Sequence, residues 1–343
     1  MIVERNAAEV GPMRAWQVQG PGEPEAVLRL VEREVPAPGP GQVRVRVAAA
    51  GIGLPDVLMC RGTYPLTPAV PFTPGQELAG TVTAVGPGVE VPIGTRVMGV
   101  SDFMNGNGAF AEEALAPATS LLPAPAALDD CAAAGFWIPN VTAWTGLVDR
   151  GQLRPGQRLA VLGAAGGSGI AAVQLGKALG ATVIAVVGEQ SRAEFCRSFG
   201  ADHVVVARDD AADDGRPLAQ ALREITDWQG VDMIFDPVGG AQGSTAMGAL
   251  ARHGRHLAVG FASGSWPTVD VQMMAVTNTS LVGVLAAPQS REHTEYVLRG
   301  LTDLLDRGAI GDTVRNRWAF DDAPVALARV ADRSQLGKCV LDL

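Results

Sequence analysis

The seven residues from Gly163 to Gly169 have the composition and spacing of a loop that binds phosphate. They read Gly-Ala-Ala-Gly-Gly-Ser-Gly and follow an apolar run. Glycine at 166 and 169 lets the backbone turn tightly and approach a pyrophosphate. The N–H groups and the dipole of a following helix then stabilise the charge of the pyrophosphate. The residues predicted to bind a dinucleotide here are Ala164, Ala165, Gly166, Gly167, Ser168, Gly169 and Ile170.

The segments around this loop are the elements that a dinucleotide site requires. Residues 157–162 are predicted as a buried strand, 168–179 as a helix and 182–187 as a second strand. A strand, a helix and a strand within roughly thirty residues form the unit in which such a loop binds nucleotide. The alternative is a glycine-rich turn in an α/β protein that binds no nucleotide, and this context disfavours it.

The end of the second strand bears on the choice of cofactor. A site specific for NAD normally has an acidic residue there to bind the ribose 2′-hydroxyl, and this chain has Val187. Gly188 leaves room for a 2′-phosphate, and Arg192 could pair with it. We therefore expect NADPH rather than NADH. Glu189 argues the other way, because a carboxylate could repel the phosphate or bind ribose hydroxyls.

Composition limits the class of protein. The chain has 343 residues, 47% hydrophobic and 18% charged, which is typical of a folded protein with two domains. A net charge of −9 disfavours binding to nucleic acid and to anionic membranes. Charged residues at Glu4, Arg5 and Glu9 interrupt any secretory signal, so we expect a cytoplasmic protein. Residues 1–12 are expected to be a leader without a function of its own.

The pattern along the chain predicts an α/β protein with two domains. From 13 to 122, short strands separated by Pro and Gly clusters indicate a β-rich barrel or sandwich. Strands then alternate with helices, and they are expected at 158–163, 182–187, 203–206, 232–235, 255–259 and 279–284. This alternation predicts a doubly wound parallel sheet with the six strands of a Rossmann domain.

The C-terminal tail is expected to return to the first domain. It opens with a helix-like segment at 291–306 and closes with a strand-like segment at 338–341. The predicted division is therefore a discontinuous domain of residues 1–135 and 289–343 and a nucleotide-binding domain of residues 136–288.

Short stretches along nearly the whole chain together resemble one family. They are AAGI at 49–52 with Asp56, RGTYP at 61–65, PFTPGQE at 71–77, VTAW at 141–144, LRPG at 153–156, the loop at 163–169, AVQL at 172–175, DPVGG at 236–240, GFASG at 260–264 and GK at 337–338. The chain resembles the zinc-independent quinone oxidoreductase branch of the medium-chain dehydrogenase/reductase superfamily. The resemblance implies a GroES-like catalytic domain, a central Rossmann domain and a homodimer formed through strand 279–284.

The resemblance also implies a site without zinc. Relatives that hold zinc have a cysteine two residues after the Gly-Ile pair and a His-Glu pair after a later glycine, where this chain has Gly53 and Gln76. Zinc needs thiolate or imidazole ligands, and the first 202 residues contain no histidine. The cysteines stand singly, at Cys60, Cys131, Cys196 and Cys339, and none forms a C-x-x-C motif.

The family likeness assigns further residues to the cofactor and the substrate. Asn140 and Thr142 would lie near the nicotinamide, Phe261 and Ala262 would form the wall beside the ring, and Val238 and Lys338 would contact the cofactor. An N-terminal helix cap is the alternative role for Thr142.

Hydride transfer needs a donor carbon held close to the acceptor and hydrogen bonds to the oxygen that becomes negative, so no metal is required. By resemblance, Tyr64 lies at the mouth of the pocket, where it either donates to that oxygen or shapes the cleft. Asp56 either lines the polar wall or caps the following helix. Trp137 and Trp266 could line an acceptor site, although a place in the core is expected for each.

These inferences favour an NADPH-dependent oxidoreductase that reduces a quinone or the activated double bond of an enone. The family often has asparagine where this chain has Gly53, which leaves the substrate class open. One alternative is an enoyl-thioester reductase of lipid or polyketide type. Another, of a different class, is a protein that binds or senses NADPH without turnover.

Overall fold

The chain forms two compact units in the computed structural model, which describes residues 11–208, 211–212, 217–286 and 290–343. The first unit contains the chain up to Trp137 together with Val314–Leu343, and the second is Ile138–Thr313. The boundary after Trp137 lies two residues from the boundary expected after residue 135. The second boundary differs more, because the chain returns to the first unit at Val314 rather than at 289.

Helix α10 (Arg291–Asp306) accounts for this difference. Its Tyr296 ring packs edge-on against Trp144, with ring centroids 5.7 Å apart, and its His293 bonds Asp149. Both partners belong to the second unit. A helix following the last Rossmann strand therefore packs on the second unit before the chain leaves it.

The first unit is built mainly of short strands. Its elements are β1 (Met13–Val18), α1 (Pro24–Val27), β2 (Leu28–Arg33), β3 (Gln42–Ile52), α2 (Leu54–Cys60), β4 (Glu77–Val85), β5 (Arg96–Val100), η1 (Phe103–Asn105), β6 (Glu113–Pro117), η2 (Ala118–Ser120), β7 (Leu121–Pro123), α3 (Asp130–Ala134), β15 (Val314–Ala319), η5 (Phe320–Asp322), α11 (Ala323–Ala331) and β16 (Lys338–Asp342). The sheet order is β15-β16-β3-β4-β5-β7, with β6 also paired to β3, whereas β1 and β2 form a separate hairpin.

Strand β3 shows why this sequence forms a sheet with one buried face. Val43, Val45 and Val47 alternate with Arg44 and Arg46, and the valines are at most 4% exposed. The returning strand β16 pairs antiparallel with β3, so the C-terminal residues complete the core of the unit. The first unit is thus the β-rich domain expected from the sequence.

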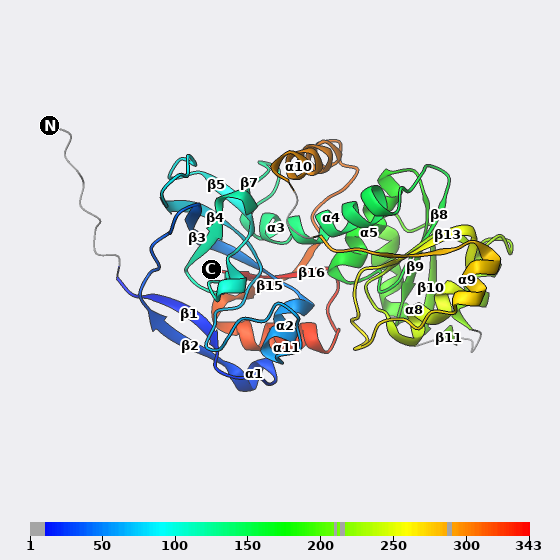
Figure 1. Ribbon diagram of the computed structural model, residues 1–343, viewed down its shortest axis with the longest axis horizontal. Coiled ribbons are helices and arrows are strands. Elements are labelled where there is room, and N and C mark those ends of the chain that lie inside the picture. Colours follow the sequence, from blue (N-terminus) through cyan, green and yellow to red (C-terminus); the bar gives the residue numbers. More distant parts are fainter. Residues whose placement is uncertain (1–10, 209–210, 213–216, 287–289) are drawn as a thin grey trace. The chain divides into compact units, whose positions relative to one another are not determined.

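The second unit alternates strands and helices. Its elements are α4 (Trp137–Trp144, which begins at the division), the π-helix η3 (Thr145–Arg150), β8 (Arg158–Val161), α5 (Gly167–Ala178), β9 (Thr182–Val187), η4 (Gln190–Arg192), α6 (Ala193–Ser198), β10 (His203–Arg208), β11 (Ala211–Ala212), α7 (Leu218–Ile225), β12 (Val231–Asp236), α8 (Gly240–Met247), β13 (Leu250–Ala258), α9 (Val271–Thr277), β14 (Ser280–Gly283) and α10. These lie in the green to orange part of the ribbon in Figure 1.

The sheet of the second unit has the strand order of a Rossmann domain. Among the described residues, parallel strands follow one another as β10-β9-β8-β12-β13-β14, and β11 adds antiparallel beside β10. The predicted six-stranded parallel sheet is confirmed. Strand β8 lies at its centre, where the order reverses, and ligands of such sheets bind outside the carboxyl ends of the strands at this point.

Side-chain alternation gives the sheet two apolar faces. Ala160 and Ile184 pack with helices α7 and α8 on one face, whereas Leu159 and Val183 lie beside Gly176 of α5 on the other. Helices on both faces explain why the central strands β8, β9 and β12 are almost entirely buried. No helix within the described ranges is long and apolar enough to cross a membrane.

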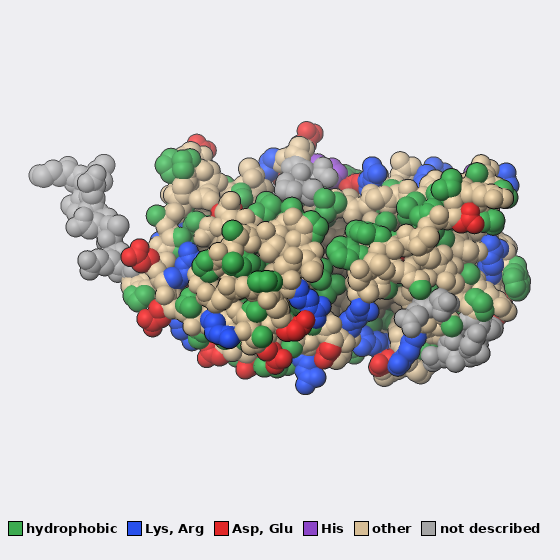
Figure 2. Space-filling model, turned by 60° about the horizontal axis from the view of Figure 1, so that its bottom comes forward, with side chains coloured by type: hydrophobic (Ala, Val, Ile, Leu, Met, Phe, Trp, Pro, Cys, Tyr) green, Lys and Arg blue, Asp and Glu red, His purple; other side chains and the backbone are tan. Residues whose placement is uncertain are grey.

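Charged side chains of both signs are interspersed on the face of the molecule shown in Figure 2. Acidic residues exceed basic ones in the whole sequence by 36 to 27.

Candidate functional site

The glycine-rich turn between β8 and α5 is shaped by close backbone contacts. Gly163 has φ = +57°, a conformation that glycine adopts readily. A Cβ at Gly169 would overlap the Gly163 carbonyl oxygen, so residue 169 must be glycine in this turn. At Gly166 the nearest such contact is an ordinary 3.4 Å. The predicted loop therefore forms, and Gly163 and Gly169 are its sterically restricted positions.

The N-terminus of α5 has the features of an anion site. The helix starts at Gly167, and within the described chain no side chain caps it at Gly166. The first N–H groups of a helix lack partners within the helix, and its dipole favours negative charge there. The Ala164 N–H donates to Val186 O at 3.1 Å, and the Ile170 N–H donates to Gly166 O at 2.8 Å. Residues 167–169 thus supply the N–H groups best suited to a phosphate.

The loops that follow β12 and β13 are bonded to each other beside this turn. The Ala262 N–H donates to Pro237 O at 3.1 Å, and the Ser263 N–H donates to Val238 O at 2.8 Å. A Cβ at Gly163 would lie 2.9 Å from a methyl group of Val238. The structure therefore brings Val238 and Ala262 together near the glycine turn, as a shared cofactor site requires.

A buried Asp236–His256 pair underlies these loops. Asp236 Oδ1 accepts from the N–H groups of Val238 at 2.9 Å and Gly239 at 2.8 Å, and its Oδ2 lies 2.9 Å from His256 Nε2. The side chains are 0% and 1% exposed. His256 Nδ1 has no hydrogen-bond partner among the described residues, which fits a tautomer with the proton on Nε2. The sequence did not predict this pair, although a histidine directly before the apolar residues 257–259 of a predicted strand was a signal for it.

Phe261 packs against Trp266, with ring centroids 5.0 Å apart and planes inclined at 45°. Trp266 is 54% exposed, so the expected place in the core is wrong for this residue. Trp137 is 6% exposed, and the same expectation is confirmed there. The indole of Trp266 thus lies against Phe261, the residue predicted to form the wall beside the nicotinamide.

Asn140 and Thr142 both lie on α4. Asn140 is fully buried, whereas Thr142 is half-buried. Residues two apart on a helix do not face each other, so the helix does not bring these side chains together. Thr142 lies within the helix rather than before it, which excludes the alternative role of an N-terminal cap.

In the first unit, Asp56 caps α2 and joins two loops. It is 1% exposed, and its oxygens accept from the N–H groups of Gly53 at 2.8 Å and Gly75 at 3.1 Å. Burial raises the pKa of Asp56 to about 6, although the backbone donors and Lys338 oppose this effect. Both oxygens have backbone partners, which favours the capping role over a place in a substrate wall.

Lys338 is paired inside the first unit. Its Nζ lies 2.9 Å from Glu77 Oε2, and the two side chains are 8% and 1% exposed. Gly51 packs against this pair, since a Cβ there would lie 2.8 Å from the same Glu77 oxygen. Tyr64 is half-buried against the apolar core of the unit. The predicted roles of Lys338 and Tyr64 at a ligand stay predictions.

The potential metal ligands do not cluster. Among the described residues, no group of three or more His, Cys, Asp or Glu side chains is arranged to hold a metal. The four cysteines are buried, and burial raises the pKa of the Cys60 and Cys196 thiols to about 12 and of Cys131 and Cys339 to about 11. Gln76 is 8% exposed, and its amide nitrogen has no hydrogen-bond partner in the described structure.

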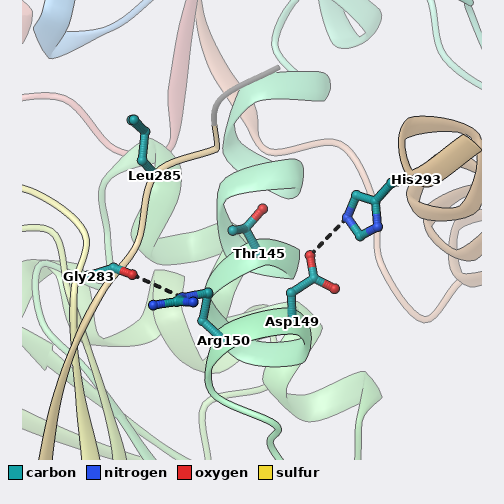
Figure 3. Close-up of a pocket in the computed structure, with 6 residues that line it drawn as sticks. All are labelled: Thr145, Asp149, Arg150, Gly283, Leu285 and His293. Carbon is teal, nitrogen blue, oxygen red and sulfur yellow. Dashed lines mark hydrogen bonds and ion pairs between the residues drawn. The ribbon is translucent and has the colours of Figure 1, made fainter. Parts of the chain in front are cut away.

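A polar hollow of about 490 Å³ lies in the second unit beside the end of β14. It is lined by Thr145, Asp149, Arg150, Gly283, Leu285 and His293. Figure 3 shows Asp149 facing His293, at 3.1 Å, and Arg150 donating to the Gly283 carbonyl at 3.2 Å. The hollow shares no residue with the glycine turn.

The fold and the glycine turn together define a class: a two-domain protein with a β-rich unit and a Rossmann unit that carries a glycine-rich turn at the N-terminus of a helix. Comparison with family models agrees. The alcohol dehydrogenase GroES-like domain matches residues 39–126, and the zinc-binding dehydrogenase family matches residues 167–302.

Individual relatives narrow this class. A quinone oxidoreductase-like protein 2 homolog of Nematostella vectensis is 31% identical over 299 residues, covering 85% of this chain and 79% of that protein. Quinone oxidoreductase of Escherichia coli, solved with NADPH, is 27% identical with a TM-score of 0.87, covering 96% of this chain and 100% of that one. One component of the phenolphthiocerol/phthiocerol polyketide synthase of Mycobacterium tuberculosis is 31% identical over 85% of this chain, but only 13% of that component. The chain belongs to the medium-chain dehydrogenase/reductase superfamily, in its quinone oxidoreductase-like branch.

Proposed function

We propose that this oxidoreductase binds NADPH and reduces a quinone or the activated double bond of an enone without a metal. The observation that carries the proposal is the uncapped N-terminus of α5 behind a turn that Gly163 and Gly169 make possible. Such a terminus is suited to a pyrophosphate. The Escherichia coli relative, named as a quinone oxidoreductase and solved with NADPH, supports the choice of cofactor and substrate class.

Residues of the second unit would hold the cofactor. The N–H groups at 167–169 would bind the pyrophosphate, and Val238, Phe261 and Ala262 would enclose the nicotinamide, with Asn140 and Thr142 contributing from α4. When bound, the nicotinamide supplies the hydride. The protein's part is then to orient the reactants and to exclude water.

Residues of the first unit would act on the acceptor. As hydride arrives, negative charge develops on the acceptor oxygen, and a donor at that oxygen stabilises it. The Tyr64 phenol is the proposed donor. Asp56 positions the surrounding backbone by holding Gly53 and Gly75. Gly53 and Gln76 occupy the positions where zinc-containing relatives have ligands, which supports a reaction without zinc.

A reductase of enoyl thioesters is the second candidate, and the match to a polyketide synthase component favours it. We would follow NADPH oxidation by the purified protein with an ortho-quinone, a short enone and an enoyl thioester in parallel. Turnover of the quinone or the enone supports the proposal. Preference for the thioester supports the second candidate, and tight NADPH binding without turnover supports a sensing protein.

We also propose a homodimer formed through β14. This strand ends the sheet order, and its Leu281 is 39% exposed. A sheet edge with exposed apolar residues is suited to pairing with a second copy. The mass in solution should therefore be that of a dimer, and Leu281→Arg should shift it toward the monomer. A monomeric wild-type protein would contradict this assembly.

A further inference from the structure

Arg208 lies beside the end of β9, where the sequence predicts the determinants of cofactor choice. It is the last residue of β10, which runs parallel to β9 with Val206 opposite Val187. Its Nε donates to the Gly188 carbonyl at 3.0 Å, so this bond fixes the guanidinium at the turn after β9. The sequence alone places Arg208 about twenty residues from Gly188.

The same guanidinium lies near the carboxylate of Glu189, the residue that disfavours NADPH in the sequence. Arg208 Nη2 lies 3.5 Å from Glu189 Oε1, and the Ser191 hydroxyl donates to Glu189 Oε2 at 3.4 Å. Each oxygen of the Glu189 carboxylate therefore has a polar partner within 3.5 Å, although the Arg208 and Glu189 side chains are 71% and 51% exposed. A carboxylate engaged in this way is less available to the 2′- and 3′-hydroxyls of a ribose, and its charge is partly neutralised.

There is room for a phosphate beside this pair. Gly188 is exposed, and a Cβ built on it would meet no atom of the described residues within 4 Å. A guanidinium has five N–H donors, so one bonded to a carbonyl through Nε still has N–H groups that can bind a phosphate. In doubly wound folds the ribose 2′ group is recognised at the end of the second strand, which is β9 here.

We propose that Arg208 and Glu189 together determine the preference for NADPH over NADH. Arg208 binds the 2′-phosphate and at the same time holds Glu189 away from the ribose hydroxyls. This inference rests on the proposed function, because it assumes a nicotinamide cofactor in the second unit. Arg192, the candidate from the sequence, is half-buried in the next turn and acts as a second cation.

Binding of 2′,5′-ADP and of 5′-AMP tests the proposal without any turnover. The two probes differ only in the 2′-phosphate. Arg208→Gln should weaken the binding of 2′,5′-ADP about tenfold or more, because a charge-assisted bond is lost. It should leave the affinity for 5′-AMP unchanged or raise it, because Glu189 becomes available to the ribose. Adding Glu189→Gln to Arg208→Gln should remove any gain in affinity for 5′-AMP and restore part of the affinity for 2′,5′-ADP.

Arg154→Gln is the matched control. Arg154 is exposed in the same unit but precedes β8, at the amino end of the strands. It should alter neither affinity, and urea unfolding should show all variants equally folded. If Arg208→Gln lost equal affinity for both probes, or lost no affinity for 2′,5′-ADP, the proposed role of Arg208 would be overturned. A wild-type protein that binds neither probe would instead overturn the proposed cofactor.

Discussion

Replacing His256 by leucine should loosen the loop that encloses the proposed cofactor. His256 is 1% exposed and bonds Asp236, whose other oxygen holds the N–H groups of Val238 and Gly239. Leucine suits the strand, since the residues opposite 256 are Ile234 and Leu281. The Asp236 Oδ2 atom would lose its partner while buried, which costs about 1–3 kcal/mol and somewhat more for a charged group. The melting temperature should fall by about 5 °C.

The effect on the cofactor distinguishes positioning from stability alone. Because Val238 lies against the glycine turn, we expect the dissociation constant for NADPH to rise about three- to tenfold, while kcat changes little. Fluorescence titration and thermal unfolding measure the two effects. His256→Gln, whose amide can donate to Asp236, should recover part of the melting temperature and part of the NADPH affinity. His203→Leu, on the exposed start of β10, serves as the control. Unfolding unchanged from wild type would refute the reasoning, and lowered stability with unchanged NADPH affinity would refute the positioning role.

The glycine turn, Asp56, the lack of a metal-ligand cluster in the described part of the chain and Tyr64 each give a further prediction. Gly169→Ala should abolish NADPH binding, measured by titration, because the new methyl group overlaps the Gly163 carbonyl, whereas Gly311→Ala, where a Cβ meets nothing within 4 Å, should not. The raised pKa of Asp56, about 6, means that the folded state binds its proton more tightly than the unfolded state does. Stability from this residue is therefore present below about pH 4 and lost as pH rises through 6, by about 3 kcal/mol. The free energy of unfolding of Asp56→Asn, measured in urea, should lack this fall with rising pH. An unchanged fall would mean that other groups cause it. Exhaustive treatment with a chelator should leave turnover intact, and recovery only on adding zinc would contradict a reaction without metal. Tyr64→Phe should lower kcat about tenfold if the phenol donates to the acceptor oxygen, whereas a change in KM alone would mean that Tyr64 only shapes the cleft.

The Rossmann unit could be predicted because its signals are local. A β-branched strand, a glycine turn and an alanine-rich helix lie within about thirty residues, and each favours its conformation by itself. Residues 157–162, 168–179 and 182–187 accordingly match β8, α5 and β9 within a few residues. The return of the chain as β16, which pairs with β3, could be anticipated only from the strand-like residues at 338–341.

Interactions between residues far apart in the sequence could not be predicted. Nothing in the sequence pairs Lys338 with Glu77, or Arg208 with Gly188, because these contacts depend on strand order and register. Strand β15 was missed because three of its six residues are Arg or Asn, which leaves little apolar alternation. The helix at 291–306 was predicted, but its partner was not, since an amphipathic helix does not specify the surface that it covers.

Transfer of deuterium from NADPH that carries deuterium at both hydrogen positions of its reactive carbon tests the central claim most directly. Protein stripped of metal would be mixed with the labelled cofactor and a short enone, and the product analysed by mass spectrometry. The proposed function predicts one deuterium on the β-carbon of the product. Consumption of NADPH without label in the product, or transfer only after a metal is restored, would contradict direct hydride transfer at a site without metal.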